Sequence, residues 1–157
     1  MPLSCLSLTP APAPVSVDEV LSPLLVVKFD RSGSEQDLEA YLKARAAYLR
    51  REQPHIVLFD ARQVHMLSAR VRQRYTEWLR EHEVALRQWT LGTAYVIESP
   101  TVRMMMSVVR HFASMANPFI VTATLPPAAG WAADRLSEAG LVQSAARIRA
   151  HYAVPSS

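Results

Sequence analysis

Three acidic residues stand at places in the sequence where carboxylates could do chemistry. Asp30, Asp60 and Glu98 each end an apolar run that has the composition of a buried strand. The carboxyl ends of parallel strands meet at one edge of a sheet, so these carboxylates could hold Mg²⁺ or accept a phosphoryl group there. Such a phosphoacceptor would also need a paired acid at the first strand and a lysine after the last, and the sequence has neither. We therefore predict no metal site and keep the three acids as secondary candidates; the alternative is that they cap turns and helix N-termini.

Other catalytic patterns are missing from the sequence. The segment RSGS at 31–34 lacks the spaced glycines and the lysine of a phosphate-binding loop. No Ser–His–Asp, Cys–His or metal-spaced histidine pattern occurs, because the five histidines are scattered along the chain. We therefore expect a protein that is not an enzyme, with no catalytic residue and no cofactor.

The segment after the second apolar run suits an acidic partner. Ser68 is the predicted N-cap of a helix, and Arg62 precedes it in the loop. The first turn and the residues just beyond it hold Arg70, Arg72 and Arg74. Cations at this end interact unfavourably with the helix macrodipole. The cost is only a few tenths of a kcal/mol for each cation, and solvation of the charge offsets it. They would also suit an incoming acidic group, since the helix end presents N–H donors. The candidate interaction residues here are Arg62, Ser68, Arg70 and Arg74.

A methionine-rich helix, predicted at 101–116, carries more apolar surface than a helix on a sheet needs. One stripe, which includes Val102 and Met106, has the spacing of a core face. A second apolar stripe lies outside it. The second stripe could be covered by the C-terminal segment, by a second protein chain or by an apolar ligand, and the flexible thioether of methionine suits the latter two. The candidate interaction residues of this helix are Arg103, Met104, Val108 and Met115.

The elements that must position these residues alternate along the chain. Runs rich in Val, Ile and Phe predict four strands, at 23–29, 55–60, 92–98 and 118–124. Helical periodicity predicts helices at 34–53, 68–89, 101–116 and about 127–139, with a shorter helix in the tail at 141–152. This alternation predicts an α/β fold with a mainly parallel four-stranded sheet. Arg45 falls in the middle of the apolar face of the first helix, where it must reach solvent, pair with an acid or lie against tyrosine rings.

Composition limits the classes of protein that fit. The chain has 157 residues, enough for one domain at 18–157, and the proline-rich segment 1–17 is predicted to be a flexible arm. No apolar run reaches the roughly 18 residues of a membrane span. A single cysteine cannot form an internal disulfide, so we expect a cytoplasmic location. The net charge of +3 comes without a nucleic-acid motif, so we expect no nucleic-acid partner.

The segment IVLFDARQVHMLSARV at 56–71, followed by LGTAYVIESP and the methionine-rich helix, resembles the STAS domain of anti-sigma factor antagonists. It is most similar to small bacterial STAS-like proteins, over roughly residues 20 to 137. Asp60 and Val64 match the pattern of the family. Ser68 stands where the family has an aspartate, and Ala69 stands where it has a phosphorylated serine. Ser68 is therefore the candidate phosphoacceptor, one residue away from the usual position.

The resemblance implies a non-catalytic domain that binds a partner through the second helix and the loop before it. We therefore expect a cytoplasmic regulatory module that docks on a protein, or on a second copy of the chain, through this loop and helix and the methionine-rich helix. A small-molecule or lipid-binding domain is the alternative. A metal-dependent phosphoacceptor is a weaker alternative.

Overall fold

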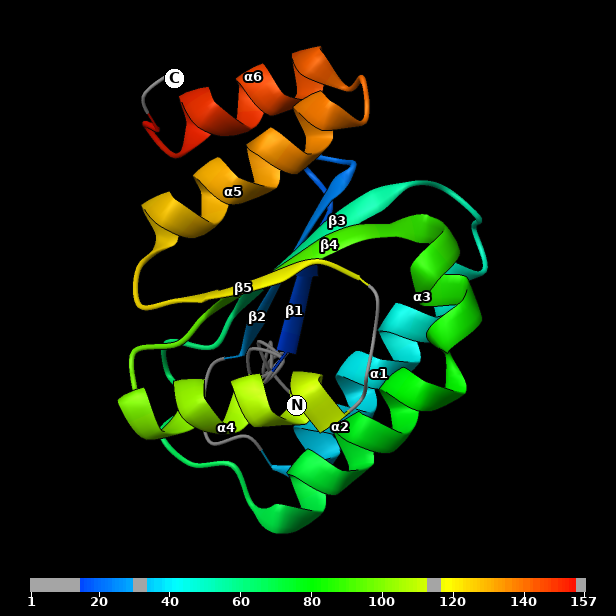
Figure 1. The fold of residues 1–157 in the computed structure, drawn as a ribbon, viewed down its shortest axis with the longest axis vertical. Coiled ribbons are helices and arrows are strands. Elements are labelled where there is room, and N and C mark those ends of the chain that lie inside the picture. The colour runs from blue at the N-terminus through cyan, green and yellow to red at the C-terminus, as the bar shows by residue number, and fades with distance from the viewer. Residues whose placement is uncertain (1–14, 30–33, 113–116, 155–157) are drawn as a thin grey trace, which may run out of the picture.

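The computed structural model describes residues 15–29, 34–112 and 117–154. These residues form a five-stranded sheet with helices on both faces (Figure 1). The strands are β1 (Val15–Asp18), β2 (Leu24–Phe29), β3 (His55–Asp60), β4 (Thr90–Val96) and β5 (Phe119–Thr122). The helices are α1 (Glu35–Leu49), α2 (Ala69–Glu81), α3 (Glu83–Trp89), α4 (Pro100–Phe112), α5 (Leu125–Glu138) and α6 (Val142–His151).

The strands lie in the sheet in the order in which they occur in the chain. β2, β3, β4 and β5 pair in parallel, which confirms the mainly parallel α/β sheet. The sheet has one strand more than the sequence predicts, because β1 pairs antiparallel with β2. The prediction of an arm is wrong for residues 15–17, which belong to β1. Four alternating residues after a proline run are too few to distinguish an edge strand from a coil.

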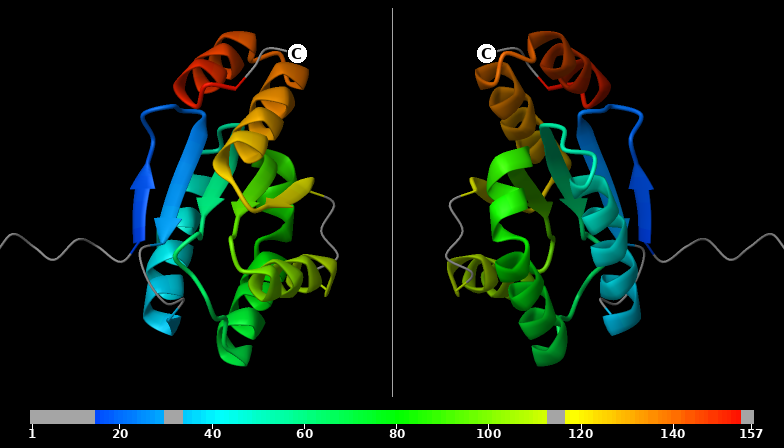
Figure 2. Two further views of the ribbon diagram at one scale, coloured as in Figure 1. Left: turned by 90° about the vertical axis from the view of Figure 1, so that its left-hand side faces the viewer. Right: turned by 90° about the vertical axis from the view of Figure 1, so that its right-hand side faces the viewer.

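Two hydrophobic cores lie on opposite faces of the sheet. Helices α1 to α4 cover one face, and α5 and α6 cover the other (Figures 1 and 2). β3 is buried along its whole length, because successive side chains of a strand point to opposite faces. Val57 and Phe59 belong to the core under α1 to α4, and Ile56 and Leu58 to the core under α5 and α6. The continuous apolar runs of the sequence follow from this double burial.

The C-terminal segment packs on the face of the sheet away from α4. α5 presents four buried alanines to the strands, which let the helix approach closely, and α6 packs against α5. The predicted tail helix is therefore confirmed as α6. None of the helices in the described ranges is long and apolar enough to span a membrane.

The single helix predicted at 68–89 is wrong, since the chain forms two helices that meet at His82. The backbone N–H of His82 and its ring Nδ1 both donate to the carbonyl of Trp78, each over 3.0 Å. The imidazole also stacks on the Trp78 ring, with centroids 4.4 Å apart. His82 then leaves helical geometry, at φ −106° and ψ 17°, and α3 starts at the next residue. Apolar periodicity continues through the break, so it does not reveal the break in the sequence.

Candidate functional site

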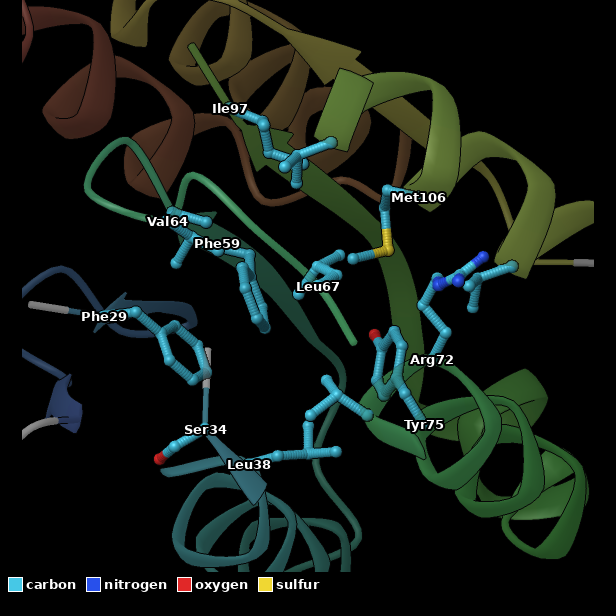
Figure 3. A pocket seen from close by; sticks show the side chains of 14 residues that line it. Phe29, Ser34, Leu38, Phe59, Val64, Leu67, Arg72, Tyr75, Ile97 and Met106 are labelled. Carbon is cyan, nitrogen blue, oxygen red and sulfur yellow. The ribbon is translucent and has the colours of Figure 1, made fainter. Parts of the chain in front are cut away.

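The candidate site lies where the parallel strands end. The loop at 61–68, the start of α2 and the helix α4 meet at the carboxyl edge of the sheet (Figure 3). Val64 and Leu67 of the loop and Val102 and Met106 of α4 line one cavity there. The structure thus brings together the two segments in which the sequence predicts interaction residues.

Asp60 and Arg62 form a closed pair at this edge. Asp60 is buried, and its Oδ1 accepts from Nε of Arg62 over 3.0 Å while its Oδ2 accepts from Nη2 over 2.9 Å. The hydrogen bond to Asp60 raises the pKa of Arg62 above its ordinary value. This bidentate geometry is strong and specific. Arg62 is therefore already paired, and an acidic partner would have to compete with Asp60 for it.

Of the three carboxylates that could bind a metal, Asp60 and Glu98 lie among the described residues. Asp60 is paired with Arg62, and Glu98 is exposed after β4. Asp30 lies outside the described residues. Within the described ranges no group of three histidine, cysteine or acidic side chains could hold a metal ion.

Ser68 caps α2 as the sequence predicts. Its backbone is extended, and its Oγ accepts from the backbone N–H of Val71 over 3.2 Å. This hydrogen bond satisfies one of the free N–H donors at the helix start. Ser68 is exposed, so its hydroxyl is accessible from solvent.

Two of the arginines of α2 are joined to the glutamates of α1. Nε of Arg70 lies 3.2 Å from Glu35, and Nε of Arg74 donates to Glu39 over 2.6 Å. The hydrogen bond to Glu39 raises the pKa of Arg74. Such exposed pairs contribute little free energy, about 0–1 kcal/mol each. Arg70 and Arg74 therefore connect the two helices, and an acidic partner would have to compete with these glutamates.

α4 presents two different apolar faces, as the sequence predicts. Val102 and Met106 are buried in the core. Met104 is 64% exposed and Val108 is 43% exposed. The C-terminal helices lie on the opposite face of the sheet (Figure 1), so the hypothesis that the C-terminal segment covers this stripe is wrong. Met115 lies outside the described residues.

Arg103 does not extend into solvent toward a partner. Its Nη1 donates to the carbonyl of Ile97 over 3.0 Å and to that of Glu98 over 2.7 Å. Ser99 accepts from the backbone N–H of Val102 over 3.2 Å and caps the helix. Arg103 therefore fixes the turn between β4 and α4 rather than acting as a free cation.

The cavity at this edge was not anticipated from the sequence. Its volume is about 40 Å³, and the surface it presents among the described residues is apolar. Phe29 of β2, Phe59 of β3, Tyr75 of α2 and Met106 of α4 point into it (Figure 3). Arg72 also lines the cavity, whereas the neighbouring Arg70 and Arg74 face α1. Residues so far apart in the chain converge only through the tertiary fold, and local periodicity does not show such a space.

A buried polar group at the other end of β3 was also missed. Nη1 of Arg45 lies 2.6 Å from Nε2 of His55, and Nη2 donates to Thr90 over 3.1 Å. Nδ1 of His55 donates to the carbonyl of Gln53 over 2.8 Å, which leaves Nε2 as the acceptor. Burial, and then the charge of Arg45, lower the pKa of His55 to about 4. Neutral acceptors thus hold Arg45 inside the core. The sequence pattern allowed Arg45 to reach solvent, but in the structure it does not.

The chain was compared with known proteins in three ways. Models of protein families, curated protein sequences and solved structures give no match to it.

Proposed function

We propose that this chain is a non-catalytic, STAS-like protein-interaction module with a regulatory role in the bacterial cytoplasm. It binds a protein partner through a docking surface, which consists of the loop 61–68, the first turn of α2 and the outer stripe of α4. The observation that carries the proposal is the exposure of Met104 and Val108, which the C-terminal helices leave uncovered because they pack on the opposite face of the sheet.

The chemistry of this surface suits a protein partner. Met66 in the loop is 72% exposed, so soft apolar side chains project from both segments that wall the cavity. Methionine has three rotatable bonds and a polarizable sulfur, and it adapts to the shape of a partner. Fully burying one such side chain stabilises a complex by about 1.5–3 kcal/mol. A second copy of the chain could supply the complementary surface, and light scattering would then show a dimer.

Ser68 gives the docking surface a candidate means of regulation. It is exposed and caps α2, so a phosphate on its hydroxyl would sit at the positive end of the helix dipole. Arg70 follows Ser68 by two residues, and its side chain is exposed. Phosphorylation would add negative charge at the centre of the surface and change which partners bind there.

The proposal is tested by affinity capture with purified bait proteins from a native lysate. The baits are the wild type, the double variant Met104→Glu with Val108→Glu, and the control Val84→Glu. Val84 is an exposed apolar residue of α3, outside the docking surface. We expect one set of proteins to be captured by the wild type and by Val84→Glu and lost from the double variant. Equal capture by all three baits would refute the proposed surface.

A further inference from the structure

The apolar cavity at the carboxyl edge of the sheet has one polar group in its wall that needs a partner. Nε of Arg72 is buried, and within the described residues it has no hydrogen-bond partner. Arg70 and Arg74, two residues away on either side, pair with glutamates of α1. Arg72 points instead toward α4 and Met106 (Figure 3). Leaving a buried donor unsatisfied is unfavourable, so an acceptor is expected at this place.

A water molecule does not suit the cavity. Water in a protein interior normally makes about three hydrogen bonds, and the surface that the described wall presents is apolar. A ligand with an apolar body and an acceptor group matches both the apolar wall and the buried Nε donor of Arg72. The body fills the space between Phe59, Leu67 and Met106, and the acceptor faces Arg72.

We propose that this cavity binds a short aliphatic carboxylate. The planar guanidinium of Arg72 offers two parallel N–H donors, which match the two oxygens of a carboxylate. Arg72 is only partly buried, so its outer nitrogens can hold a charged group near solvent while the chain of the ligand enters the core. The site lies beneath α4, on the side away from Met104 and Val108, although the loop 61–68 and the first turn of α2 belong both to its wall and to the docking surface.

The volume of the cavity sets the length of the ligand. A cavity of roughly 150 Å³ takes benzene, or roughly 25 Å³ for each carbon atom. About 40 Å³ therefore accommodates roughly two carbon atoms beyond the carboxylate. Propionate has two such carbon atoms and fits this limit, and butyrate, which has three, is the longest chain that enters, with the methylene next to its carboxylate at the mouth of the cavity. Longer chains would have to displace the core side chains.

Two variants separate this site from general binding of anions or apolar molecules. Arg72→Met removes the guanidinium and keeps an unbranched apolar side chain. Arg70→Met is its matched control, since Arg70 lies on the same helix, is 84% exposed and faces away from the cavity. Ala61→Val keeps Arg72 and adds roughly two carbon atoms at a buried position of the cavity wall, which fills the space.

The experiment is a titration of the full chain with sodium salts from acetate to octanoate at constant ionic strength, followed by protein NMR and by thermal melts. We expect the dissociation constant to fall about fourfold for each methylene up to butyrate and then to level off. Butanol and butylammonium should bind at least tenfold more weakly than butyrate. Arg70→Met should bind like the wild type, and Arg72→Met and Ala61→Val should lose binding.

Three results would overturn the proposal. The first is the absence of binding by every carboxylate to the wild type. The second is binding of butyrate by Ala61→Val or Arg72→Met with wild-type affinity. The third is affinity that keeps rising to octanoate, which would indicate adsorption to exposed apolar surface. If Arg72→Met fails to fold, Ala61→Val and the neutral and cationic analogues of butyrate still decide the question.

Discussion

Acidification should destabilise this protein through His55. The ring is buried, its Nδ1 donates to Gln53, and its Nε2 accepts from Arg45. A proton on Nε2 would remove this acceptor and place a second positive charge beside the guanidinium. Burial, and then the charge of Arg45, lower the pKa of His55 from 6.5 to about 4 in the folded protein.

The sign and size of the effect follow from proton binding. The unfolded chain protonates His55 near pH 6.5, whereas the folded chain does so only near pH 4. Between these values the unfolded state binds more protons, so the free energy of unfolding falls as the pH falls. Each pKa unit corresponds to about 1.4 kcal/mol, so His55 alone should remove ~3 kcal/mol between pH 7 and pH 4. That is a large part of the stability of a typical domain.

The assay is urea unfolding of the wild type, His55→Gln and His65→Gln at pH 7, 5.5 and 4. Glutamine retains an oxygen that can accept from Arg45 but does not titrate, and His65 is an exposed control. Carboxylates contribute equally to all three proteins, so the difference between curves isolates His55. We expect the wild type and His65→Gln to lose ~3 kcal/mol more than His55→Gln. Parallel curves for the three proteins would refute the role given to Arg45 and burial.

Substitutions at three further positions test the packing and the cap of α2. Ser68→Ala should lower the free energy of unfolding by about 1 kcal/mol in chemical denaturation, whereas Ser68→Asp should retain most of it; equal loss in both would contradict the cap. Met106→Ala enlarges a buried space beneath α4 and should cost about 2–5 kcal/mol by the same measurement, and a cost below 1 kcal/mol would show that the core does not depend on this stripe. Gly92→Ala places a Cβ 2.6 Å from the Trp131 ring and should cost about 1–3 kcal/mol, so an unchanged melting temperature would show that α5 is free to move away from the sheet.

Local sequence patterns were sufficient for most of the fold. Strands β2, β3 and β4 have buried apolar side chains on both faces, and their composition reveals them. The role of Ser68 as an N-cap was also predictable, because a cap depends only on residues within one turn. The two faces of α4 were also predictable, since the spacing of Val102 and Met104 in the helix decides which of them is buried.

The remaining features of the fold and the site depend on contacts between segments that are far apart in the sequence, which local patterns do not reveal. Arg70 pairs with Glu35 and Arg74 with Glu39, across 35 residues of sequence in each case, so the sequence could not show that these cations are already paired. The side of the sheet taken by α6 is likewise a property of the whole chain. The sequence could not show that Arg72 lines the apolar cavity while Arg70 and Arg74 do not, because the cavity is formed by segments from α1, β3, α2 and α4.

The most direct test of the docking surface is the affinity of one captured partner for Met104→Glu, measured by calorimetry beside the wild type and Val84→Glu. Met104 is largely exposed, so the variant should keep the melting temperature of the wild type. A buried charge in the complex should weaken binding at least tenfold, or about 1.4 kcal/mol, while Val84→Glu binds normally. Unchanged affinity of Met104→Glu would contradict the account, and so would a lowered melting temperature of the free protein.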